Sequence, residues 1–158
     1  MANEYEELIE QITQQEKKLV FDSFTYDDAF ALGNLLYRRA KEQNLHLTVD
    51  ITRNGQQLFH AALPGTSPDN DQWIIRKNRV VMRMHKSSFR VGNELKLAGQ
   101  TIEEKCLISS MEYAAHGGAF PLTVKNCGVI GTITVSGLPQ ASDHRFVTEV
   151  IEEYLSKK

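Results

Sequence analysis

Apolar residues recur every three or four positions in several stretches of the chain, and this spacing predicts amphipathic helices. Thr25 and Asp71 are expected to cap the starts of two of them, and Gly99 is expected to end a third. The expected helices cover residues 4–18, 25–43, 72–85, 88–97 and 142–155, with short helical pieces over 101–116.

Strict alternation of apolar and polar residues predicts half-buried strands elsewhere. Asn54-Gly55 is a strong hairpin signal because both positions accept a positive φ, and Lys125-Asn126 marks a second turn. The expected strands cover residues 45–51, 57–63, 120–124 and 127–135, with a short one over 19–21. Two hairpins flanked by helices predict an α/β (α+β) fold with a mainly antiparallel sheet.

Length and composition predict one globular domain over residues 1–158, since 41% of the residues are hydrophobic and 24% are charged. The net charge of -2 makes nucleic acid an unlikely partner, and no apolar run is long enough to cross a membrane. The acidic N-terminal residues do not resemble a secretion signal. Cys106 and Cys127 lack a metal-binding spacing and are expected to be reduced, so we expect a cytoplasmic protein without a metal site.

Common catalytic and nucleotide-binding motifs are missing from the sequence. It contains no GxSxG, Walker loop, HExxH or GxGxxG. Ser136 lies in Val-Ser-Gly, which is not a nucleophile elbow. These absences disfavour a hydrolase, an NTPase or a dehydrogenase but leave an enzyme of an unfamiliar type open.

A glycine pair offers the best candidate for a binding loop. Gly117 and Gly118 either form a tight structural turn or present backbone amides to a small ligand. His116 beside them is either a satisfied loop residue or a metal, haem or proton-transfer group. Asp143, at a helix start, is in the simplest interpretation a helix-stabilising acid. If the loops meet, one polar cluster would contain His116, Ser136, Asp143 and His144.

A basic stripe follows in the central helices, provided that one helix continues through them. Its members recur at spacings of three and four, and they are Arg76, Arg79, Arg83, Lys86 and Arg90, with Lys77 alongside. In one interpretation the stripe is solvated or pairs with acids elsewhere, such as Glu4, Glu6, Glu7 and Glu10. In the other, Arg79 and Arg83 bind an anionic ligand or an acidic protein partner.

Several segments together resemble one known family. They are the Gly117-Gly118-Ala119-Phe120-Pro121-Leu122 turn, Gly131-Thr132-Ile133-Thr134-Val135-Ser136-Gly137, Asp143 at the last helix, and Val49-Asp50 followed by Gly55. The chain is similar to the GlcG/HbpS-like ("haem-degrading") family. Ala114-Ala115-His116-Gly117-Gly118 and Val135-Ser136-Gly137-Leu138-Pro139 resemble one cytosolic branch of it. Trp73 and the basic helix after it are features of this branch and weigh against haem binding.

The resemblance implies a profilin-like, three-layer α/β/α fold and assembly into a homo-oligomer. Haem is a cofactor that only the resemblance suggests, and the cofactor is otherwise unknown. Our leading hypothesis is a cytosolic homo-oligomer that binds a small molecule near residues 116–118, 136–139 and the last helix. The alternatives are a haem-binding or haem-degrading protein, with His116 as an iron ligand, and a scaffold for protein interactions.

Overall fold

A computed structural model of the chain describes residues 2–157. Its four strands form one sheet in the order β2-β1-β4-β3, and every neighbouring pair is antiparallel. The strands are β1 (Thr48–Arg53), β2 (Gln56–Ala62), β3 (Ala119–Val124) and β4 (Gly128–Ser136). The two central strands come from different hairpins, so their pairing joins the two halves of the chain.

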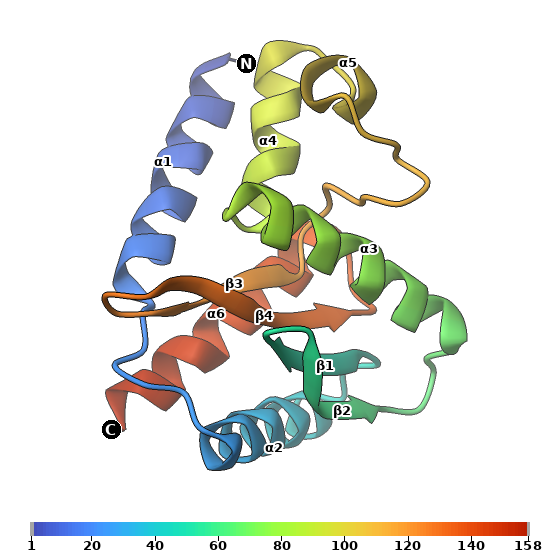
Figure 1. Cartoon of the computed structure of the whole chain (residues 1–158). Coiled ribbons are helices and arrows are strands. Elements are labelled where there is room, and N and C mark those ends of the chain that lie inside the picture. Colours follow the sequence, from blue (N-terminus) through green and yellow to red (C-terminus); the bar gives the residue numbers. More distant parts are fainter. Residues whose placement is uncertain (1, 158) are drawn as a thin grey trace.

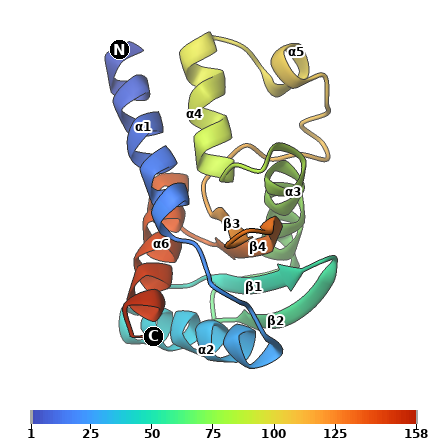
Figure 2. The same ribbon diagram turned by 60° about the vertical axis from the view of Figure 1, so that its left-hand side comes forward.

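Helices cover both faces of this sheet (Figures 1 and 2). Helices α2 (Tyr26–Glu42) and α6 (Gln140–Ser156) lie on one face, and α3 (Pro68–Met84) crosses the other. Helix α1 (Ala2–Lys18) packs beside α4 (Ser88–Ala98), and α5 (Ile102–Cys106) is a short helix after α4. The predicted three-layer α/β/α arrangement with an antiparallel sheet is therefore confirmed. No helix within residues 2–157 is long and apolar enough to span a membrane.

The two faces of the sheet differ in polarity because strand side chains alternate between them. Ile133 and Val135 of β4 point into the main apolar core with Leu32 and Leu36 of α2. Thr134 and Ser136 of the same strand point the other way, toward α3, where they hydrogen-bond Asn78 and Asn70. Helix α3 thus packs on a polar layer, and that layer leads to the candidate site.

Several predicted element boundaries are wrong. Helix α3 begins at Pro68, and its cap is Ser67 rather than Asp71, which falls in its first turn. Proline is favoured at a first helical position, so the Pro/Gly segment contains a helix start as well as a loop. Strand β1 begins at Thr48, and the expected strand over 19–21 is reduced to a single bridge between Phe21 and Val124.

The elements with complete local signals are in their expected places. Thr25 caps α2, and its side chain and that of Asp28 form a reciprocal capping box. Asn54 and Gly55 both have positive φ in the turn of the first hairpin, as predicted.

Two further expectations differ from the structure. The only helix between residues 101 and 116 is α5, and the expected further helical pieces are turns. The last helix begins at Gln140, two residues before its expected start.

Candidate functional site

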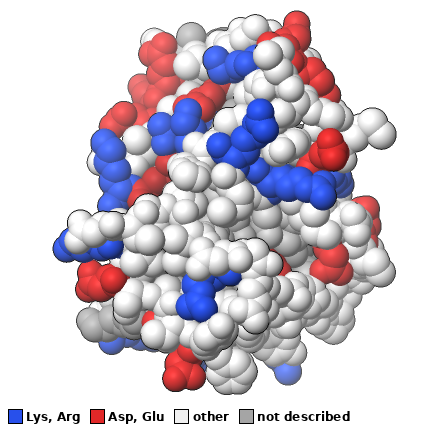
Figure 3. Space-filling view, in the orientation of Figure 1, with Lys and Arg blue, Asp and Glu red and all other residues white. Residues whose placement is uncertain are grey.

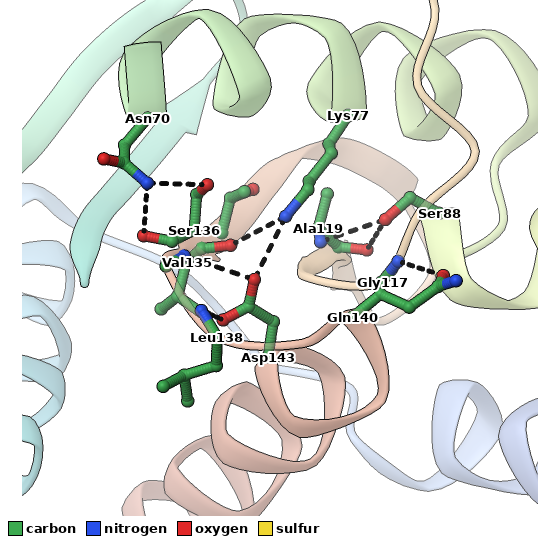
Figure 4. A network of polar contacts seen from close by, with 12 residues as sticks. Asn70, Lys77, Ser88, Gly117, Ala119, Val135, Ser136, Leu138, Gln140 and Asp143 are labelled. Carbon is green, nitrogen blue, oxygen red and sulfur yellow. Dashed lines mark hydrogen bonds and ion pairs between the residues drawn. The ribbon is translucent and has the colours of Figure 1, made fainter. Parts of the chain in front are cut away.

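A cavity of about 390 Å³, lined mainly by polar residues, lies where α3, the loop before β3, the end of β4 and the start of α6 meet. Figure 4 shows the hydrogen-bond network at this junction. The cavity is lined by Asn70, Trp73, Lys77, His116, Ser136, Gly137, Leu138, Gln140 and Asp143. Three of the predicted site residues, His116, Ser136 and Asp143, therefore share one cavity.

A buried ion pair forms part of the cavity wall. Lys77 of α3 and Asp143 of α6 are 3% and 1% exposed, and Lys77 Nζ lies 3.2 Å from Asp143 Oδ2. Lys77 also donates to the Val135 carbonyl oxygen at 3.4 Å, at the end of β4. The Asp143 carboxylate accepts from the Gly137 and Leu138 amides at 3.4 and 3.0 Å. The pair thus connects α3 and α6, which lie on opposite faces of the sheet, to the end of the central strand β4 (Figure 4).

Burial acts on both members of this pair. It lowers the pKa of Lys77, while the attraction of Asp143 opposes that shift. It raises the pKa of Asp143, while Lys77 and the Leu138 and Gly137 amides oppose that shift. Desolvation disfavours both charged groups. A proton transfer from Lys77 to Asp143, which gives a neutral amine and a neutral carboxylic acid, therefore costs less free energy here than it would in water.

Two rings also line the cavity, those of His116 and Trp73. The His116 and Trp73 rings meet edge to face, with their centroids 5.6 Å apart. Burial lowers the pKa of His116, and the positive charges of Lys77, Lys96 and Arg76 lower it further, so the imidazole is neutral at pH 7. Neither of its ring nitrogens has a hydrogen-bond partner within residues 2–157. The imidazole is therefore available to a ligand.

A second cavity of about 690 Å³ adjoins the first and shares Trp73, His116 and Gln140 with it. Apolar side chains from α4, α5 and the following loop form much of its wall, among them Leu95 and Ile102. Arg76 and Lys96 also line it, and Arg76 stacks over the Trp73 ring at 4.3 Å. His116 and Trp73 thus line both cavities, of which the larger has the more apolar wall.

The glycine pair lies in the loop directly before β3, close to the end of β4 and the first residue of α6. Gly118 has a φ of +138°, and a Cβ there would lie 2.4 Å from the Val135 carbonyl oxygen. A Cβ on Gly117 would lie 2.2 Å from the Gln140 carbonyl oxygen. The Gly117 amide donates to Gln140 Oε1 at 3.1 Å, so it is used within the protein. The close approaches and the positive φ of Gly118 give the pair a structural role, and its role in ligand binding stays a prediction.

His144 does not join the predicted polar cluster. Its side chain points away from the cavity, is 4% exposed and packs against Phe89 and Phe120. Nε2 lies 2.7 Å from Gln15 Oε1, whereas the buried Nδ1 has no partner within residues 2–157. Asp143 and His144 are neighbours in sequence, and consecutive helical residues point in different directions.

The basic residues do not form one continuous stripe. Helix α3 ends at Met84 because His85 adopts a left-handed conformation with a φ of 56°, so Lys86 and Arg90 belong to the next segment. Figure 3 shows separate groups of lysine and arginine side chains over the upper half of one face, with acidic side chains next to them. Lys86 and Arg90 form ion pairs with Glu94 and Glu16 rather than with the four expected acids of α1.

Arg79 and Arg83 lie outside the Lys77–Asp143 cavity. Arg79 donates to the Glu112 carbonyl oxygen at 3.3 Å, and Arg83 lies 5.9 Å from the Tyr113 ring centroid. Both side chains therefore contact the loop after α5. Their role in binding an anion stays a prediction.

Sequence reasoning placed Lys77 beside the basic stripe and missed it as a site residue. Lys77 follows Ile74 by three positions and precedes Val80 and Val81 by three and four, and all three are buried. A lysine on the apolar face of a helix is the signal that identifies it, because lysine is rarely buried without a partner. Trp73, Asn70 and Gln140 carry no comparable signal, since their place depends on how α3 and α6 pack.

The fold is that of a small α/β/α domain with an antiparallel sheet, and its candidate site is an open cavity at the end of β4. Residues 24–152 match the family model described as "Haem degrading protein HbpS-like". A UPF0303 protein of Streptomyces coelicolor is 51% identical over 149 residues, covering 94% of each chain. A UPF0303 protein of Edwardsiella ictaluri is 45% identical, covering 95% of this chain and 96% of that protein. The chain belongs to the HbpS-like family, as the sequence resemblance predicted.

Solved structures agree with this assignment. The Ybr137w protein superposes with a TM-score of 0.86 at 34% identity, covering 94% of this chain and 88% of that one. HbpS superposes with a TM-score of 0.65 at 19% identity, covering 84% and 89% of the two chains. At that identity, the match to HbpS establishes a shared fold.

The glycine turn gives a first prediction. Gly118→Ala should lower the free energy of unfolding by roughly 3 kcal/mol or more, because it adds backbone strain and a clash with Val135. Gly128→Ala is the matched control, since Gly128 also has a positive φ but a Cβ there meets nothing within 4 Å. Chemical denaturation of both variants measures the difference. Equal losses would show that the close approach at Gly118 has no energetic consequence.

His144 gives a second prediction, for stability against pH. Burial lowers the pKa of His144 to about 4, from 6.5 in the unfolded chain. The unfolded state therefore takes up the proton first, and the free energy of unfolding falls as the pH drops from about 6.5 to about 4, by roughly 3 kcal/mol. His144→Gln should lose less stability over this window in urea denaturation. An equal loss in the variant and the original protein would contradict this origin.

Proposed function

We propose that the protein is a cytoplasmic homo-oligomer that binds a small molecule in the Lys77–Asp143 cavity. The observation that carries this proposal is a buried ion pair that opens on a cavity rather than on packed side chains. Buried ion pairs add little net stability compared with apolar side chains of similar size. The volume of about 390 Å³ falls within the usual range for ligand sites. Ligand recognition accounts for this costly pair better than stability does.

The cavity favours a polar ligand with an acceptor oxygen. A lysine ammonium has three N–H donors, and Lys77 directs two of them at Asp143 and Val135. Three donors are available to a ligand in the cavity wall: the third N–H of Lys77, the Ser136 hydroxyl and the side-chain NH2 group of Gln140. Because the charges of Lys77 and Asp143 cancel, the site suits a carbonyl or carboxylate oxygen on a molecule of modest net charge. The Trp73 and His116 rings would flank its planar part.

Haem is the second candidate ligand, and the larger cavity supports it. A single imidazole can hold haem iron, and the neutral His116 ring has no hydrogen-bond partner within residues 2–157. Leu95 and Ile102 supply apolar contact, and Arg76 and Lys96 supply cations for the propionates. The residues present therefore fit the group, which would supply redox and oxygen chemistry when bound. A related solved structure is a PduOC:haem complex, at 15% identity and a TM-score of 0.65.

Other features support the proposed homo-oligomer and the proposed cytoplasmic location. Large apolar side chains are exposed on the surface and would be covered in a homo-oligomer; they are Tyr26, Phe30, Ile75, Met82, Leu97, Leu107 and Met111. Cys106 and Cys127 are both free thiols, which suits a reducing compartment. The acidic protein partner expected for the basic residues stays a prediction, and Arg79 and Arg83 remain its candidate contacts.

The third prediction tests ligand binding through Trp73, the only tryptophan of the chain. Native mass spectrometry of freshly purified protein identifies any retained molecule. Titration of that molecule, or of haemin, should change Trp73 fluorescence, because the indole lines both cavities. His116→Ala should weaken binding about tenfold or more, the equivalent of about 1.4 kcal/mol, without changing the melting temperature.

His46→Ala is the matched control, because His46 contacts the Pro64 carbonyl oxygen away from both cavities. It should leave the titration unchanged. An absorbance band of bound haem that His116→Ala abolishes would favour the second candidate ligand. A His116→Ala variant that binds as the original protein does but melts far lower would show that His116 is structural and that the site assignment is wrong.

A further inference from the structure

We propose that Lys77 captures a small aldehyde or ketone as a Schiff base in this cavity. The inference rests on the proposed function, because it assigns a ligand class and a covalent step to the same site. Stability alone does not explain a lysine here, since replacing both members of the pair by apolar side chains would avoid the cost of desolvating two charges.

The position of the amine meets the geometric needs of a nucleophile. Lys77 Nζ is held at 3.2 Å from Asp143 Oδ2 and 3.4 Å from the Val135 carbonyl oxygen, so its direction is fixed. Opposite it lies the bare backbone of Gly118, where a Cβ would be only 2.7 Å from Nζ. Within residues 2–157, Lys77 is also the only lysine that lines this cavity. A carbonyl group in the cavity would therefore meet one amine and no competing one.

Asp143 completes the proton balance of the step. Its carboxylate takes one proton from the Lys77 ammonium, and the neutral amine attacks the carbonyl carbon to form a C–N bond. The second amine proton moves to the former carbonyl oxygen, giving a carbinolamine. Asp143 then returns its proton to that hydroxyl, the C–O bond breaks, and water leaves. The products are a protonated imine on Lys77, an ionised Asp143 and one water molecule, so atoms and charge balance without an oxidant or reductant.

The surroundings favour both halves of this proton transfer. Burial lowers the pKa of Lys77 and raises the pKa of Asp143, so the neutral pair is more accessible than it would be in water. The final iminium would stay paired with the Asp143 carboxylate, which the Gly137 and Leu138 amides hold in place. The Lys77 side chain is only 4% exposed, and this low access of bulk water would slow hydrolysis of the imine.

The test uses pyruvate as a ketone probe and benzaldehyde as an aldehyde probe, each added to the full chain with borohydride. Reduction converts an imine into a stable amine, and peptide mapping by mass spectrometry then locates it. We expect one adduct, on Lys77, formed at least tenfold faster than on Lys86. Lys86 is a suitable internal reference because it is also ion-paired, with Glu94, but is more exposed.

Two lysine-to-arginine variants sharpen the result. Lys77→Arg keeps the charge beside Asp143 but cannot form an imine, and it should abolish the fast adduct. Lys86→Arg should leave it unchanged. Mapping on the original protein decides the question even if Lys77→Arg does not fold.

Labelling spread over exposed lysines, with Lys77 unmodified by both probes, overturns covalent capture. If Trp73 fluorescence still reports binding of a molecule in that case, the proposed function survives without the covalent step. If no molecule alters Trp73 fluorescence and no adduct forms on Lys77, both proposals fail.

Discussion

The ion pair between Lys77 and Asp143 is the interaction on which the rest of the site depends. It joins α3 on one face of the sheet to α6 on the other, and it reaches the end of β4 through the Val135 carbonyl. A buried charge without its partner is strongly unfavourable, so the two helices must keep their relative positions for either residue to stay charged. The distance between α3 and α6 at the cavity therefore follows from the pair.

The polar face of the sheet explains why this pair can be buried at all. Thr134 and Ser136 of β4 face α3, and Asn78 and Asn70 of that helix hydrogen-bond them. The main apolar core lies on the opposite face, against α2 and α6. Tight apolar packing would leave no cavity, whereas a hydrogen-bonded layer next to the Gly117–Gly118 turn leaves room for a ligand beside the charged pair.

Local signals predicted the fold well because they act over a few residues. The Thr25 capping box, the Asn54-Gly55 turn and the alternation along β4 each need only their neighbours in sequence. The start of α3 was misplaced because Asp71 and Ser67 are both acceptable caps, and Pro68 decides between them. The isolated bridge of Phe21 depends on its partner Val124, which lies far away in sequence.

The site was only partly predictable, because its residues are far apart in sequence and meet only in the folded chain. His116, Ser136 and Asp143 stood out by residue type and loop position, and the fold brings them together. His144 was misplaced because helical geometry separates neighbours, and Lys77 was missed because its partner lies 66 residues away. A charged residue on an otherwise apolar helix face indicates a buried partner, but only the fold reveals that the partner is Asp143.

A double-mutant cycle on the pair tests this account most directly. Lys77→Met and Asp143→Asn each leave one buried charge unpaired and should each lower the free energy of unfolding by roughly 3–5 kcal/mol. The double variant should lose clearly less than the sum of the two, by about 2 kcal/mol or more, because no unpaired charge remains. Additive losses, within about 0.5 kcal/mol, would show that the two residues do not stabilise each other and would contradict the central role of the pair.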